Sequence, residues 1–173
     1  VDNTAVEGVA LQSNTGGGSN TAVGHSALAG STGSDNTAVG RSAGHHGAYP
    51  LLDGSNNTFL GAYSSLGSAE ERNNATAIGA YAIVDADNAL VLGGTGANAV
   101  NVGIGVTAPT QKLEIVGGGI KLNGTGATRP DCDVTSGPGN RGLIWFTNAG
   151  GGANDTLAVC TKSFNTYAWR PLY

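Results

Sequence analysis

A short unit recurs through the first hundred residues, and this repeat limits the possible folds more than any other feature. The sequence Asn-Thr-Ala-Val-Gly stands at residues 20–24 and again at 36–40. Successive copies are 10 to 21 residues apart. A constant apolar unit with spacers of variable length is typical of a solenoid whose insertions lie in loops. Looser copies occupy residues 3–7, 57–61, 75–79, 89–93 and 99–103.

Each residue type in the unit suits one place in a coiled β-structure. Thr, Ala and Val alternate in direction along a strand, and β-branched side chains favour strand geometry. The Gly can adopt a positive φ, so it can turn the chain after the strand at little cost. Asn is suited to turns and to stacked hydrogen-bonding ladders between coils. We therefore predict seven coils, whose six steps make a roll about 29 Å long, with the alternative that the short last copies run straight and do not coil.

The composition indicates that one copy of such a roll cannot build a sufficient core. Gly supplies 30 of the 173 residues, while aromatic residues make up 6% and charged residues 12%. Ordering a coil costs about 1–2 kcal/mol per residue, yet residues 20–35 offer only Val23 and Leu28 as large apolar side chains. Apolar surface from identical neighbours would compensate. We predict symmetric self-association, with three parallel chains about one axis as the preferred arrangement.

Residues 1–95 carry the Asn-Thr-Ala-Val-Gly-x-x-Ala units and closely resemble the head repeats of trimeric autotransporter adhesins. That resemblance implies a homotrimeric fibre in which each chain forms a left-handed parallel β-roll, and we assign residues 1–97 to this head. The spacing is less regular than in that family. The 21-residue step implies a bulging loop around residues 49–53.

Residues 98–128 have a different pattern, which we assign to a connector. Residues 112–116 alternate polar and apolar side chains as a half-buried strand does, and Pro109 ends the strand before them. Glycines 117–119 and the pair Asn123-Gly124 are turn signals. The block at residues 102–117 is similar to the shaft and neck segments of phage tail fibres, which implies an intertwined β neck.

Residues 129–173 are rich in aromatic side chains and are expected to form a small antiparallel β tip domain. Strands are predicted near residues 141–147, 156–162 and 167–172, with a glycine-rich turn at 148–155. The pattern resembles the compact C-terminal tips of mosaic trimeric adhesive fibres in predatory bacteria. Six of the ten aromatic residues lie here: Trp145, Phe146, Phe164, Tyr167, Trp169 and Tyr173.

The two cysteines, Cys132 and Cys160, both lie in the predicted tip. An exported fibre could pair them in a disulfide, and a domain with so small a core would gain from that link. Two buried free thiols are the alternative. A zinc site is disfavoured because no histidine is near either cysteine in the sequence.

The tip also contains the candidate ligand-binding residues. Aromatic faces with neighbouring amide, carboxylate and guanidinium groups are suited to recognising sugars or peptides. Core packing is an equally good interpretation of the aromatic residues, and Asp155 could simply cap the glycine-rich turn. The candidate set is Trp169, Tyr167, Asp155, Asn140 and Arg141.

Charge and motifs exclude several other classes of function. The net charge of −4 and the absence of a basic cluster argue against nucleic acid and anionic membranes as partners. No nucleophile elbow, metal-binding histidine pair or cysteine–histidine arrangement is present, so we predict neither an enzyme nor a cofactor nor a metal site. His25, His45 and His46 are interpreted as loop residues and not as an ion site on a threefold axis.

Together these features predict an exported adhesin that lies on the cell surface or in the extracellular space. We expect this chain to be a fragment of a longer fibre. Its partners would be two further copies of itself and a glycan or protein on a target cell, with glycan preferred on the resemblance. A phage-type receptor-binding tail fibre is the first alternative. A structural trimerisation cap without ligand binding is the second.

Overall fold

The computed structural model describes residues 2–45, 54–68, 70–121, 132, 143–147, 156–163 and 166–172. The chain divides into two units, Val1–Val116 and Gly117–Tyr173, and each is described by itself. The predicted boundaries after residues 97 and 128 remain predictions. The expected bulge at residues 49–53 lies outside the described residues.

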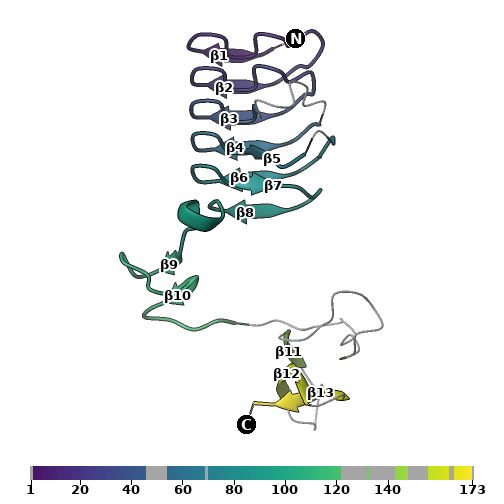
Figure 1. Ribbon diagram of the computed structural model, residues 1–173, viewed down its shortest axis with the longest axis vertical. Helices are drawn as coiled ribbons and strands as arrows, with labels where there is room; N and C mark the ends of the chain where they lie inside the picture. The colour runs from purple at the N-terminus through teal and green to yellow at the C-terminus, as the bar shows by residue number, and fades with distance from the viewer. Residues whose placement is uncertain are drawn as a thin grey trace. The chain divides into compact units, whose positions relative to one another are not determined.

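The first unit is a parallel β-solenoid, as the repeat predicts (Figure 1). Each coil adds one three-residue strand to a six-stranded parallel sheet, and equivalent residues of the repeat are paired in register, Thr4 with Thr21 and Thr21 with Thr37. The strands are β1 (Thr4–Val6), β2 (Thr21–Val23), β3 (Thr37–Val39), β4 (Thr58–Leu60), β6 (Thr76–Ile78) and β8 (Leu90–Leu92).

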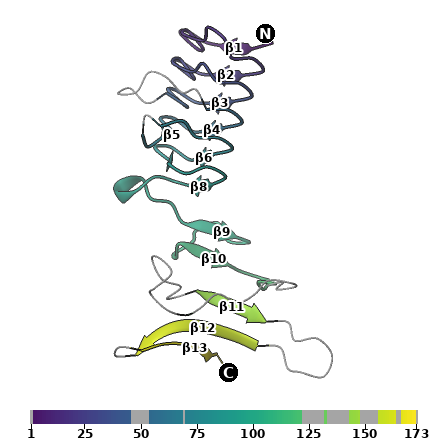
Figure 2. The ribbon, with the colours of Figure 1, turned by 90° about the vertical axis from the view of Figure 1, so that its right-hand side faces the viewer.

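A second parallel sheet forms on two of the coils only. It pairs β5 (Ser65–Leu66) with β7 (Ile83–Val84). In the coils before these, single backbone hydrogen bonds continue the same contact, such as Leu28 N–H donating to the carbonyl of Ala43 at 2.9 Å. In these coils, the segment that follows the strand of the six-stranded sheet therefore stacks on the same segment of the next coil (Figure 2). Among the described residues, only β5 and β7 have enough paired residues to form strands.

The core is a narrow column inside the roll. The middle residue of each strand points inward, so Ala22, Ala38, Phe59 and Ala77 are fully or almost fully buried. Leu28, Leu66 and Val84 enter from the opposite wall, each with no exposed surface. Because most inward positions hold alanine, the two walls can approach closely, and the coil interior has room for few large side chains.

An asparagine ladder joins the coils, as expected from the repeat. The N–H of Asn20 donates to Asn3 Oδ1 at 2.8 Å, that of Asn36 to Asn20 Oδ1 at 2.9 Å, and that of Asn57 to Asn36 Oδ1 at 2.9 Å. Each amide nitrogen donates in turn to a backbone carbonyl, as Asn36 Nδ2 does to Gly54 at 2.9 Å. The ladder satisfies polar groups that are almost fully buried.

The glycine of the repeat is required for two reasons. Gly40 has a φ of 131°, in a region that residues with a Cβ rarely adopt. The glycines of successive coils also stack directly, and a Cβ on Gly40 would lie 2.8 Å from the carbonyl carbon of Gly61. The predicted turn is therefore confirmed, together with a close backbone approach that the repeat alone does not reveal.

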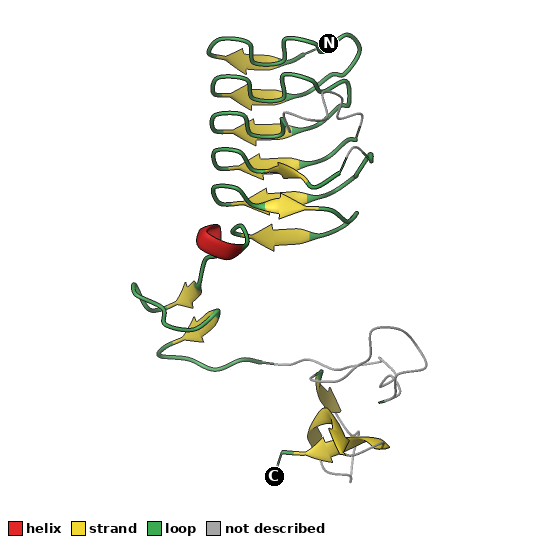
Figure 3. Ribbon diagram, in the orientation of Figure 1, coloured by secondary structure: helices red, strands yellow, loops and turns green. Residues whose placement is uncertain are grey.

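The seventh predicted coil does not join the stack. After β8 the chain makes one turn of 3-10 helix, Gly96–Asn98 (Figure 3). Strand β9 (Val102–Ile104) then pairs in parallel with β10 (Leu113–Ile115). The roll thus has six coils and five steps, or about 24 Å at the usual strand spacing. The reason is length, since the last step of ten residues is shorter than any step inside the stack.

The second unit contains a three-stranded antiparallel sheet in the order β11-β12-β13. Its strands are β11 (Ile144–Thr147), β12 (Thr156–Ser163) and β13 (Thr166–Pro171), close to the predicted ranges. Cys132 and Cys160 form a disulfide with their Cα atoms 5.5 Å apart, so the free-thiol alternative is wrong. Within the described part of the chain, no helix has the length and apolar character needed to cross a membrane.

Candidate functional site

A column of aliphatic side chains runs along the outside of the six-stranded sheet. The last residue of each strand in the six-stranded sheet points outward, away from the alanine core. Leu60 and Val6 are each 46% exposed, and the other members are half-buried or exposed to a similar degree. We call this set the aliphatic column: Val6, Val23, Val39, Leu60, Ile78 and Leu92.

Exposed apolar residues continue beyond the stack, on the β9–β10 ribbon. Ile104, Leu113 and Val116 are 54%, 55% and 52% exposed. Parallel strands are normally covered on both faces, and a two-stranded ribbon by itself is marginally stable. The described residues supply no second layer over this ribbon. Its side chains and the aliphatic column are therefore candidate interaction surfaces.

Only part of the predicted ligand-binding set can be located in the structure. Trp169 lies on β13, paired with Cys160 on β12, and its side chain is half-buried. Tyr167 lies on the same strand, opposite Lys162. Asp155, Asn140 and Arg141 lie outside the described residues, so the predicted set as a whole remains a prediction.

A hollow of about 340 Å³ lies in the second unit. Ile120, Lys121, Phe146 and Leu157 line it, so an apolar surface carries one amine. Of these residues, the sequence analysis had singled out only Phe146, as one of the clustered aromatic residues. No motif or spacing pointed to the other three.

An acidic corner of the roll has a structural explanation. Arg72 donates to Glu70 at 2.7 Å and to Asp85 at 3.2 Å, and the bond to Glu70 is the main cause of the raised pKa of Arg72. Asp87 Oδ1 accepts the N–H of Asn73 at 2.9 Å. The Arg72 side chain is only 18% exposed, so this segment is better tied down than the solvated loop tip its charges would predict. In the described ranges, no three His, Cys, Asp or Glu residues are grouped to hold a metal ion.

A different corner holds a stack that the sequence analysis missed. The rings of Tyr63 and Tyr81 are parallel within 14°, with centroids 5.0 Å apart. The guanidinium carbon of Arg41 lies 5.6 Å from the Tyr63 centroid, within cation–π range. We call these three residues the aromatic corner. The sequence gives little sign of this contact. Arg41 is the first residue after its repeat glycine, whereas each tyrosine is the second residue after its own, so the repeat does not align them.

Comparison of the chain with protein-family models, with curated proteins and with solved structures gave no match.

Proposed function

We propose that this chain is part of an exported homotrimeric surface fibre, in which a stiff β-roll presents a recognition tip to a target cell. The observation that carries the proposal is the aliphatic column, which runs the full height of the roll on its largest sheet. The preferred ligand class of the tip is a glycan.

Self-association explains the column because identical coils present identical surfaces at identical heights. Three parallel rolls around one axis would place three columns against each other, coil by coil, without leaving any column exposed. Under half of each aliphatic residue remains to be buried, which corresponds to about 1 kcal/mol apiece. Several such residues per chain provide the apolar stabilisation that the alanine-rich core lacks.

The same arrangement would complete the β9–β10 ribbon. In a trimer, ribbons from three chains could wind round one another and cover Ile104, Leu113 and Val116. The proposal includes this intertwined neck and a left-handed sense for the roll, both taken from the resemblance.

Recognition is assigned to the second unit. Its antiparallel sheet carries Trp145 and Phe146 on β11 and Trp169 on β13. The disulfide from Cys160 on β12 to Cys132 suits exposure outside the cell. The binding set would be Trp169, Tyr167, Asp155, Asn140 and Arg141. Three copies of a weak site on one rigid stalk would give avidity without a tight single contact.

One observation favours the structural-cap alternative. Ile144 and Leu172, at opposite ends of the second unit's sheet, are 54% and 52% exposed, as expected if this unit associates with its own copies. A phage-type receptor-binding fibre would share the whole architecture and differ only in what it recognises.

Removal of residues 129–173 separates these functions. Trimers that still assemble but no longer bind cells or an immobilised glycan array support the adhesin. Loss of assembly supports the cap. Light scattering on the intact chain gives the first check, with about 51 kDa expected for three chains of 17.1 kDa. Shortened products after incubation with surface polysaccharide would indicate an enzyme instead.

A further inference from the structure

The aromatic corner is built on a turn that recurs from coil to coil. Tyr63 and Tyr81 have φ values of 59° and 57°, in the left-handed region. In the three preceding coils the same turn is made by Val9, Ser26 and Ser42, at 57°, 61° and 53°. A positive φ at this place is therefore a property of the coil, and side chains of different size adopt it. The fold does not require a ring here, so the two tyrosines contribute their stacking and their exposed surface.

The rings are not part of the core. Tyr81 is 48% exposed, and among the aromatic side chains whose burial the structure describes it is the one that is exposed. Tyr63 is half-buried, because Arg41 covers one of its faces and Tyr81 the other. Stacking thus orients both the guanidinium and the outer ring on a stiff scaffold, while leaving them open to solvent.

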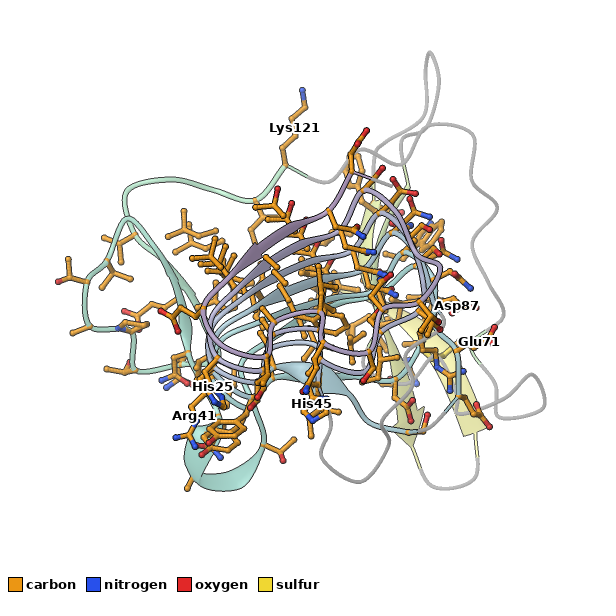
Figure 4. All side chains as sticks on the ribbon, turned by 90° about the horizontal axis from the view of Figure 1, so that it is seen from above. His25, Arg41, His45, Glu71, Asp87 and Lys121 are labelled. Carbon is orange, nitrogen blue, oxygen red and sulfur yellow. A yellow bond between two sulfur atoms is a disulfide. The ribbon has the colours of Figure 1, made fainter. Side chains whose placement is uncertain are left out.

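The guanidinium of this corner forms no ion pair within the described ranges. Arg41 and Arg72 are the only Lys or Arg residues in residues 1–95. Arg72 is paired with two carboxylates, whereas Arg41 is exposed and makes no salt bridge with any described residue. Viewed down the roll, Arg41 and His25 lie on one corner and the acidic residues Glu71 and Asp87 on another (Figure 4). The carboxylate of Glu7 accepts the N–H of His25 at 3.1 Å, which leaves its negative charge in place, and it forms no salt bridge with Arg41.

We propose that the aromatic corner binds a saccharide that carries a carboxylate, such as a uronic or sialic acid unit. The Arg41 guanidinium would bind the carboxylate with two parallel hydrogen bonds, and the Tyr81 ring would pack against the apolar face of a sugar ring. The two stacking distances place the guanidinium within about 11 Å of the Tyr81 centroid, so a short oligosaccharide can contact both. The roll then binds ligand itself and does not act only as a spacer.

The charge pattern selects this ligand over other anions. One free guanidinium on a chain of net charge −4 matches a single carboxylate, and it is too little to hold a polyphosphate backbone. An acidic peptide would also satisfy Arg41, but it would leave the exposed Tyr81 ring without a flat apolar partner.

The test uses the full chain and measures titration with oligogalacturonate and with its methyl ester, and with sialyllactose and lactose. We expect an acidic sugar to bind and its neutral counterpart to bind at least about tenfold more weakly. Arg41→Gln and Tyr81→Ser should each weaken the acidic ligand by about that factor, and Arg41→Lys by less. Arg72→Gln, the same charge change on the acidic corner, should leave affinity unchanged.

Equal binding of the acidic and neutral sugars would overturn the proposal, as would unchanged affinity in Arg41→Gln or no binding of either acidic probe. A fall in melting temperature or a change in oligomeric state without any change in affinity would assign the corner a structural role instead. Trp169→Ala should leave this binding intact, so failure of the tip as an adhesin and failure of this site are distinguishable.

Discussion

Replacing one residue of the aliphatic column with a charge should dissociate the fibre without unfolding the coil. Leu60 is the best position, because it lies on β4 in the middle of the stack and 46% of its surface is exposed. Its strand neighbour Phe59 holds the core, so a change at Leu60 leaves the coil interior untouched. We expect Leu60→Asp to fold and to fail in assembly.

The size of the effect follows from the exposure of Leu60. Full burial of a leucine contributes about 1.5–3 kcal/mol, so covering the exposed part contributes about 1 kcal/mol per chain and about 3 kcal/mol per trimer. Three unpaired carboxylates brought together at one height would cost several kcal/mol more. A total above about 5 kcal/mol corresponds to a dissociation constant raised by more than about a thousandfold.

The assay is sedimentation across a concentration series, with circular dichroism to confirm the fold. Wild-type chain should sediment at about 51 kDa and Leu60→Asp as the 17.1 kDa chain. Ile83→Asp is the matched control, because Ile83 on β7 is 47% exposed but belongs to the other sheet. A trimer of Leu60→Asp as stable as the wild type, or a wild-type chain that is monomeric when dilute, would refute the reasoning.

Three further changes probe the coil and the ribbon. Gly40→Ala should destabilise the roll by about 2–5 kcal/mol in urea unfolding, from strained φ and overlap with Gly61, whereas Gly16→Ala, with nothing within 4 Å of its Cβ, should have little effect. Asn36→Ala leaves the Asn57 N–H and the Gly54 carbonyl unpaired, which should lower the free energy of unfolding by about 2–5 kcal/mol in the same assay. If Asn36→Ala lowers it by less than Gly16→Ala does, the ladder is not a stabilising element. The N–H of Thr110 lowers the pKa of Glu114 below 4.5, so this contact should stabilise the ribbon at neutral pH and be lost as the pH falls through that lowered value. In Glu114→Gln, the stability of the β9–β10 ribbon should no longer fall with pH through loss of this contact, as measured by hydrogen exchange of the ribbon amides.

The coil could be predicted from the sequence because its rules are local. A strand of Thr-Ala-Val, a glycine with positive φ and a stacking asparagine each depend on one residue type at one place in the repeat, and the structure confirms all three. The number of coils follows from the spacing of the repeat and not from its residue pattern, and the alternative of a straight last copy is the correct one. The seventh copy, at residues 99–103, keeps the residue pattern but lacks the chain length to close another turn.

The aromatic corner illustrates what the sequence does not reveal. Arg41 and Tyr63 stand at different distances from their repeat glycines, so the register of the repeat does not pair them. Their contact depends on side-chain length and on the tight stacking of coils. The candidate tip residues follow no repeat, so no local rule of this kind applies to them, and Asp155, Asn140 and Arg141 lie outside the described residues.

The aliphatic column is not a by-product of forming a coil. The first strand position also faces outward, and it holds threonine in β1, β2, β3, β4 and β6. Only β8 departs from this, with Leu90, which is 60% exposed. The last position faces the same solvent, yet it holds Val, Leu or Ile in every strand of the sheet. The coil interior is filled by alanine from the same strands and cannot take these side chains as well. This pattern supports the proposal that a second apolar layer covers the column, and another copy of the same roll would match it in height and spacing.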